Sequence, residues 1–139
     1  MKGLDANVLV RYLTLDDPVQ SPLAIRFIES DEHIDVPLHV SVIVLCEVVW
    51  TLRSRYKYSK EQLVEILEKL LLTREIALES ENEISQGLEL YRTSSVGFAD
   101  CLIVALSKAK SVTPTMTFDL NASKLDGFQL LQIETSPET

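Results

Sequence analysis

The sequence contains few of the residues on which small secreted, low-complexity or membrane proteins depend. Two cysteines in 139 residues do not make a disulfide framework. We see no signal peptide, so we expect a reducing, cytoplasmic compartment. Four glycines and five prolines argue against low complexity. No apolar run reaches the roughly 18 residues that a membrane span requires, so we expect no association with a membrane.

Basic residues are also scarce. Thirteen Lys and Arg stand against 21 Asp and Glu, which gives a formal net charge of −8. Affinity for nucleic-acid phosphates depends mainly on Lys and Arg, so this balance weakens a nucleic-acid-binding interpretation without excluding it. Four of the acids lie in otherwise apolar segments, and two divalent cations bound to them would cancel their four negative charges.

Length and patterning predict one α/β domain over residues 1–134, followed by a disordered tail at 135–139. Short β-rich runs alternate with longer helical patterns, which is typical of a parallel sheet flanked by helices. Strands are expected at 1–4, 34–38, 76–78, 113–118 and 128–133. Helices are expected at 17–30, 41–56, 59–72, 80–92 and 97–110, with a helical turn at 121–125. Ser59 with Gln62, and Ser80 with Glu83, have the spacing of capping boxes.

Four carboxylates occupy segments that are otherwise apolar: Asp5, Glu47, Asp100 and Asp119. Burying an isolated ionised carboxylate is very costly, so such a group must be paired, protonated or bound to a cation. No Lys or Arg lies inside these four segments. Four unpaired acids that converge on one pocket would form a site for hard divalent cations.

The predicted elements place the four acids in two ways. Asp5 and Asp119 fall at the C-terminal ends of predicted strands, where the ligands of open α/β sheets bind. Glu47 and Asp100 have apolar neighbours three and four residues away, so we expect both on helix faces that meet the sheet. Spacing along the sequence does not by itself prove that the four acids share one cleft.

Four segments follow one another along the sequence: the opening, residues 4–13 (Leu-Asp-Ala-Asn-Val-Leu-Val-Arg-Tyr-Leu), Glu47 within an apolar helix, the segment 98–105 and the segment 117–119. Together they resemble the PIN domains of VapC-type toxins, and residues 4–13 resemble the start of these domains. The match covers nearly the whole chain, in order, at the usual intervals of the family. It implies a single PIN-like domain with a five-stranded parallel sheet flanked by helices.

The resemblance also implies a function, that of an endoribonuclease toxin that needs one or two Mg²⁺ or Mn²⁺ ions. It further implies a homodimer, an RNA substrate and a cognate antitoxin whose tail covers the site. The residues that match the acidic quartet of the family are Asp5, Glu47, Asp100 and Asp119, and those at its accessory polar positions are Asn7 and Thr117. In one departure, Gly97 stands where many relatives carry a further acid, which bears on the affinity for a second metal ion.

The segment 53–60 concentrates basic residues, with four cations, two tyrosines and no acid. It is interpreted either as a solvated helix end, where the helix dipole favours Lys and Arg, or as a binding surface. In the second interpretation Arg53, Arg55 and Lys57 contact RNA phosphates or antitoxin carboxylates. Trp50, just before this segment, is expected in the core or in an interface in preference to a base-stacking position.

Two other functions stay open at this stage. A receiver-type phospho-acceptor domain would also use strand-end acids and Mg²⁺, but it needs paired acids after an early strand and a Lys after a late one. Here Asp5 stands alone, and Asp119 takes the place of the Lys. A non-catalytic PIN-like binding module would not need the intact quartet. The favoured interpretation is therefore two-metal hydrolysis of RNA, since no motif of a competing chemistry is present.

Overall fold

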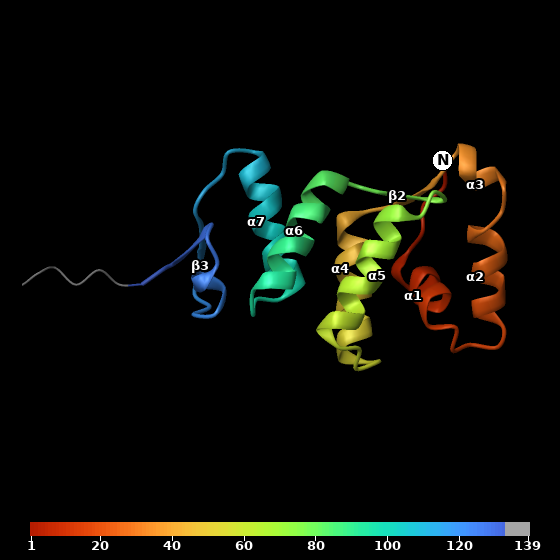
Figure 1. The fold of residues 1–139 in the computed structure, drawn as a ribbon, viewed down its shortest axis with the longest axis horizontal. Coiled ribbons are helices and arrows are strands. Elements are labelled where there is room, and N and C mark those ends of the chain that lie inside the picture. The colour runs from red at the N-terminus through yellow and green to blue at the C-terminus, as the bar shows by residue number, and fades with distance from the viewer. Residues whose placement is uncertain (133–139) are drawn as a thin grey trace, which may run out of the picture. The chain divides into compact units, whose positions relative to one another are not determined.

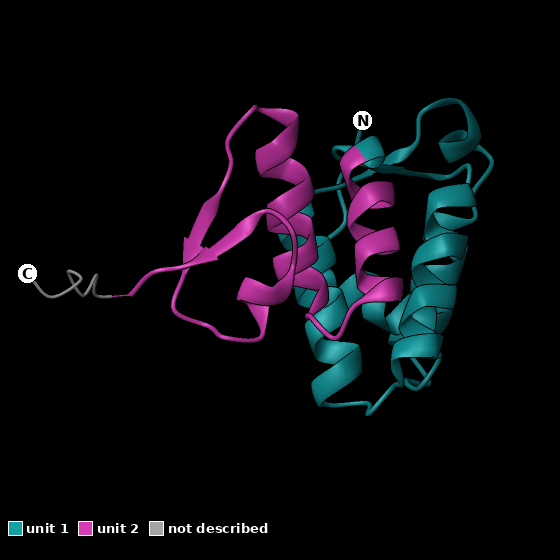
Figure 2. Ribbon diagram, turned by 60° about the vertical axis from the view of Figure 1, so that its left-hand side comes forward, with its two compact units in different colours: residues 1–82 teal, residues 83–139 magenta. Residues whose placement is uncertain are grey.

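A computed structural model describes residues 1–132 (Figure 1), and the expected tail at 135–139 lies outside the described residues. The chain divides into two compact units, residues 1–82 and 83–139, which Figure 2 shows in teal and magenta. Helices and parallel strands alternate along both, so the predicted α/β class is confirmed. One domain over residues 1–134 stays a prediction.

In the first unit, helices accompany a short parallel sheet. Its elements are α1 (Ala6–Thr14), α2 (Gln20–Ile28), α3 (Glu32–Asp35), β1 (Leu38–Val40), α4 (Val42–Ser54), α5 (Lys60–Leu72) and β2 (Ile76–Leu78). Strands β1 and β2 pair in parallel, with Leu38 opposite Ile76. The strand predicted at 1–4 is reduced to one parallel bridge between Gly3 and His39.

The helices of the first unit bury aliphatic side chains. Helix α1 contacts α2 and α4, and α4 contacts α5. Fully buried side chains of this unit include Leu9, Ile28, Leu38, Leu45, Leu52 and Leu63. Each such burial contributes about 1.5–3 kcal/mol to the free energy of unfolding, so these helices are held mainly by their apolar faces.

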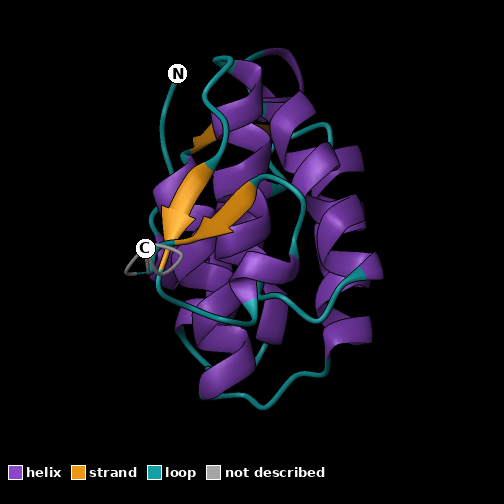
Figure 3. Ribbon diagram, turned by 90° about the vertical axis from the view of Figure 1, so that its left-hand side faces the viewer, coloured by secondary structure: helices purple, strands orange, loops and turns teal. Residues whose placement is uncertain are grey.

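The second unit contains most of α6 (Glu81–Thr93), then α7 (Phe98–Ala109), β3 (Thr115–Thr117), the short 3₁₀ helix η1 (Ala122–Lys124) and β4 (Phe128–Leu130). Strands β3 and β4 pair in parallel, with Thr115 opposite Phe128 (Figure 3). A Cβ at Gly87 would lie 3.1 Å from Leu102 Cδ1, so this glycine allows α6 to approach α7 closely. Within residues 1–132 each sheet has two strands, and a single five-stranded sheet stays a prediction.

Two segments of the first unit differ from the prediction. Residues 6–14, for which no helix was expected, form α1, because Leu9 and Val10 are buried on one face of a helix that Asp5 caps. The strand predicted at 34–38 is wrong. Residues 32–35 form α3, and β1 begins only after Pro37, which has no N–H to donate to a sheet.

Helix starts marked by serine agree with the prediction at two of three positions. The Ser41 side chain accepts from Val44 N and begins α4, and Ser59 forms the predicted capping box with Gln62 at the start of α5. Ser80 has a φ of 56°, which lies in the left-handed region, whereas the backbone of Ser41 and Ser59 is extended. Ser80 therefore does not have the backbone conformation of a capping serine.

Candidate functional site

Asp100 and Asp119 are two predicted site residues that the second unit brings into electrostatic contact. Asp100 lies half-buried in the first turn of α7, and Asp119 is exposed just after β3. Burial raises the pKa of the Asp100 carboxyl above its ordinary value, and the negative charge of Asp119 raises it further. Ionisation of Asp100 is therefore less favourable than that of a free aspartate, and a cation bound beside the two carboxylates would relieve this cost.

The Asp119 side chain is oriented by its own loop. Its Oδ1 atom accepts hydrogen bonds from Asn121 N at 2.8 Å and from Ala122 N at 3.2 Å. Thr117 Oγ1 in turn accepts from Asp119 N at 3.0 Å. Asp119 thus caps the η1 turn, and the hydroxyl of Thr117, a predicted accessory residue, fixes its backbone.

A second pair of side chains connects the Asp119 loop to the start of α7. Asn121 Nδ2 donates to Ser95 O at 3.1 Å, and Ser95 Oγ donates to Asn121 Oδ1 at 3.0 Å. Ser95 lies two residues before Gly97, the N-cap of α7. Sequence reasoning missed both residues. They are 26 positions apart and are ordinary loop residues, so no local pattern marks the pair.

Gly97 leaves room for a side chain at the start of α7. Its φ of −63° and ψ of 158° are open to any residue. A Cβ built there meets no atom within 4 Å. The position therefore accommodates the further acid that the family resemblance leads us to expect.

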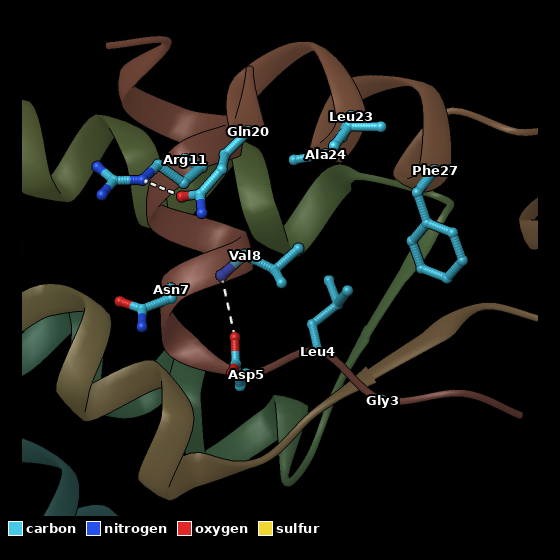
Figure 4. Close-up of a pocket in the computed structure, with 10 residues that line it drawn as sticks. All are labelled: Gly3, Leu4, Asp5, Asn7, Val8, Arg11, Gln20, Leu23, Ala24 and Phe27. Carbon is cyan, nitrogen blue, oxygen red and sulfur yellow. Dashed lines mark hydrogen bonds between the residues drawn. The ribbon is translucent and has the colours of Figure 1, made fainter. Parts of the chain in front are cut away.

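Asp5 begins α1 in the first unit. Its exposed carboxylate caps the helix, with Oδ1 accepting from Val8 N at 3.0 Å (Figure 4). Asn7 is exposed in the first turn of the same helix. Asp5 therefore has a structural role in α1, which is compatible with a role as a metal ligand because a carboxylate has two oxygens.

A cavity of about 390 Å³ adjoins Asp5 and Asn7. Helix α1 contributes Val8 and Arg11 to its lining, and α2 contributes side chains that include Leu23 and Phe27 (Figure 4). The cavity is thus mostly apolar, with the predicted acid at one edge.

The prediction that Glu47 lies on the inward face of its helix is wrong. Glu47 is exposed on α4, whose buried residues are Leu45, Val48, Val49 and Leu52. The neighbours that made its face look apolar, Ile43 and Trp50, are themselves 73% and 62% exposed. The Glu47 carboxylate is therefore accessible to a ligand and stays hydrated.

The basic residues Arg53, Arg55 and Lys57 are all exposed at the end of α4 and in the loop that follows. Tyr56, between them, is anchored in the first unit. Its hydroxyl donates to Asp16 Oδ2 at 2.7 Å and accepts from Arg11 Nη1 at 3.1 Å. This anchor fixes the end of α4 and the start of the loop, the region that carries the three cations.

Each unit carries two of the four predicted acids. Within residues 1–132, no group of three or more His, Cys, Asp or Glu side chains is arranged to hold a metal ion. A complete carboxylate quartet therefore stays a prediction, with the Asp100–Asp119 pair as its observed part. In the same described range no helix is long and apolar enough to cross a membrane.

Comparisons with known proteins agree with the four motifs. The PIN domain family matches residues 3–127 of the chain. A VapC ribonuclease of Aquifex aeolicus (strain VF5) is 27% identical over 129 residues, covering 93% of this chain and 94% of that protein. The resemblance predicted from the sequence is thereby confirmed.

Proposed function

Because the chain belongs to the PIN domain family, we propose that it is a Mg²⁺- or Mn²⁺-dependent endoribonuclease. The observation that supports this most directly is the pair of carboxylates Asp100 and Asp119: burial raises the pKa of Asp100, and the nearby negative charge of Asp119 raises it further. Two like charges close together are unfavourable unless a cation or a proton compensates them. The name of the Aquifex relative, whose length the chain nearly matches, supports RNA as the substrate.

In this proposal one or two divalent ions are held by Asp5, Glu47, Asp100 and Asp119, with Asn7 and Thr117 in accessory positions. Carboxylate oxygens are the ligands that Mg²⁺ and Mn²⁺ prefer. When bound, such ions polarise the phosphate and make water a better nucleophile. The chain's own contribution is positional: Thr117 and Asn121 hold Asp119, and the start of α7 holds Asp100.

We further propose that the protein is the toxin of a toxin–antitoxin pair. It would act in the cytoplasm as a homodimer with a five-stranded sheet, and a cognate antitoxin would cover its site. The relative's name and the family resemblance support this assignment. The exposed cations Arg53, Arg55 and Lys57 would contact RNA phosphates or carboxylates of the antitoxin.

The chemistry of the cut ends tests the proposal. If water attacks phosphorus, the 3′ oxygen leaves, and the products carry a 5′-phosphate and a 3′-hydroxyl. If the substrate's own 2′-hydroxyl attacks, the products are a 2′,3′-cyclic phosphate and a 5′-hydroxyl. We expect the first pair by mass spectrometry, and we expect cleavage to stop in chelator and to return with Mg²⁺ or Mn²⁺.

The Asp100→Asn variant tests the role of this carboxylate, because it keeps the shape of the side chain and removes its charge. Its cleavage rate should fall by orders of magnitude, since a ligand that orients the reacting phosphate is lost. Cyclic phosphate ends, or full activity in chelator, would contradict the two-metal mechanism.

A second candidate is a non-catalytic PIN-like binding module, the alternative that the sequence leaves open. Titration of the protein with Mn²⁺ by calorimetry separates the two candidates. Binding that is lost in Asp100→Asn supports the enzyme, and absence of binding supports the module.

A further inference from the structure

His33 is a buried side chain with one ring nitrogen that makes no hydrogen bond. The residue lies on the short helix α3 and is 4% exposed. Within residues 1–132, its Nε2 atom is buried and has no hydrogen-bond partner. Ser21, which is buried too, donates through its hydroxyl to Arg11 O at 2.8 Å. Buried polar groups are normally hydrogen-bonded in this way, so the Nε2 atom of His33 requires an explanation.

The other ring nitrogen of His33 indicates which form the imidazole takes. Nδ1 lies 3.4 Å from Val36 O. A carbonyl oxygen can only accept a hydrogen bond, so Nδ1 carries a proton in this contact, and in the neutral ring Nε2 then has a lone pair. A bond from one ring nitrogen to a backbone carbonyl is also how proteins orient a histidine whose other nitrogen binds a metal ion.

The Nε2 atom of His33 faces a carboxylate. Glu32 Oε1 lies 3.4 Å away, and the Glu32 side chain is 61% exposed. Two atoms that both present lone pairs at this distance repel each other unless a cation lies beside them. At the usual Zn–N and Zn–O lengths, two ligands of a tetrahedral Zn²⁺ stand about 3.4 Å apart. The separation of the two atoms therefore suits a pair of metal ligands.

A cavity of about 210 Å³ adjoins this pair, and residues 1–2 and Val36 also line it. Figure 1 shows α3 beside the N-terminal end of the chain. A water molecule takes up about 30 Å³ in the liquid, so an ion and several of its waters would fit. The Phe27 ring holds the imidazole from one side, with 4.9 Å between the ring centres. The Lys2 ammonium lies over the same Phe27 ring, 5.5 Å from its centre, and so has a favourable contact of its own.

From these contacts we propose that His33 Nε2 and the Glu32 carboxylate bind a divalent transition-metal ion such as Zn²⁺. Water would fill the remaining coordination positions, in agreement with the absence from residues 1–132 of any group of three or more such ligands. The site is independent of the four predicted acids, because Mg²⁺ prefers oxygen ligands whereas imidazole suits Zn²⁺. It does not depend on the proposed ribonuclease function. A bound ion would stabilise the folded first unit by mass action.

The sequence has two histidines, and the second, His39, provides a matched control because it is exposed on β1. The full chain would be titrated with Zn²⁺ by calorimetry in excess Mg²⁺, and its melting temperature would be measured with and without Zn²⁺. We expect one Zn²⁺ to bind and the melting temperature to rise. Glu32→Gln should weaken the Zn²⁺ affinity about tenfold or more, since even indirect partners of a metal ligand contribute that much. His39→Gln should leave the affinity unchanged.

NMR spectra of the two imidazole rings identify the ligand directly. The ring signals of His33 should move on addition of Zn²⁺ while those of His39 stay in place, and His39→Gln assigns them. Glu32→Gln is preferred to a substitution of His33, because the buried ring packs against Phe27 and its loss would also destabilise the fold. Circular dichroism would verify that each variant is folded.

A doubly protonated His33 that forms only an ion pair with Glu32 is the alternative. In that case the unmodified protein would take up no Zn²⁺ in excess Mg²⁺, which would overturn the proposal. Equal losses of affinity in Glu32→Gln and His39→Gln, or unmoved His33 signals, would overturn it as well. Asp100→Asn should bind Zn²⁺ as the unmodified protein does. A loss of Zn²⁺ binding in Asp100→Asn would assign the ion to the acids and refute the site on α3.

Discussion

Asn121 and Ser95 exchange two hydrogen bonds, of 3.1 Å and 3.0 Å, across 26 residues of the chain. They join the loop that carries Asp119 to the segment that leads into α7, where Asp100 lies. The two carboxylates thus owe their mutual position in part to a pair of uncharged side chains. This relationship makes Asn121 a positioning residue for Asp119.

Asn121→Ala should therefore impair cleavage more than it impairs folding. The free energy of unfolding should fall by about 1 kcal/mol for the exposed hydrogen bonds. The cleavage rate should fall by roughly tenfold to a hundredfold, because small misplacements of a ligand are costly. Ser123→Ala is the control, since Ser123 Oγ bonds Leu120 O within the same turn and does not reach Ser95. Equal effects of the two substitutions on cleavage would contradict a positioning role.

Two substitutions at Asp5 separate its role as a helix cap from its proposed role as a metal ligand. Asn caps a helix as well as Asp does, so Asp5→Asn should leave the metal-free melting temperature at or above that of the unmodified protein. Asp5→Ala should lower the metal-free stability by about 1 kcal/mol. Both should abolish the rise in melting temperature that Mg²⁺ gives to the unmodified protein. Scanning calorimetry measures all three, and a Mg²⁺-induced rise that survives in Asp5→Asn would remove Asp5 from the site.

The raised pKa of Asp100 predicts a dependence of stability on pH in the metal-free protein. Its stabilising contribution is complete below the unfolded-state value of 3.8, and it is lost as the pH rises through the higher folded-state pKa. Near neutral pH, Asp100→Asn should therefore melt at a higher temperature than the unmodified protein. The difference should disappear below pH 3.8. Thermal melts across this range decide the matter, and a lower melting temperature for Asp100→Asn at pH 7 would show that the charge is stabilising.

Gly97→Asp tests whether the missing acid limits the metal affinity. The position has extended backbone and open space, so the new side chain should be tolerated, with a change in stability of a few tenths of a kcal/mol at this N-cap. We expect calorimetry to show tighter binding of Mn²⁺. Gly97→Asn, which caps the helix without charge, is the control. An identical Mn²⁺ affinity in the two variants would show that a further carboxylate has no role there.

Helix starts were predictable where the signal is local. Ser41 and Ser59 cap helices through bonds to residues three positions on, so the sequence carries the whole motif. Helix α1 carries the same local signal, because Asp5 Oδ1 accepts from Val8 N three positions on. The prediction missed this helix because it assigned Asp5 to the end of a strand and to a metal site.

The candidate site was predictable in its residue types and less so in its geometry. Asp100 is half-buried as its apolar neighbours indicated, whereas Glu47 is exposed because its neighbour Trp50 is exposed too. Whether a helix face is buried depends on what packs against it, which spacing does not reveal. The bonds between Ser95 and Asn121 depend on tertiary structure in the same way.

The end of α4 and the anchored loop that follows have a consequence for the response to ionic strength. They present three exposed cations, Arg53, Arg55 and Lys57, in a chain with a formal net charge of −8. Each phosphate neutralised on a single strand releases about 0.7 of a counterion. Three contacts would give a slope of roughly −2 in a plot of log affinity against log salt, far shallower than that of strongly basic RNA-binding proteins. The affinity of these three cations for RNA should therefore fall less steeply with rising salt than that of a protein that contacts many phosphates.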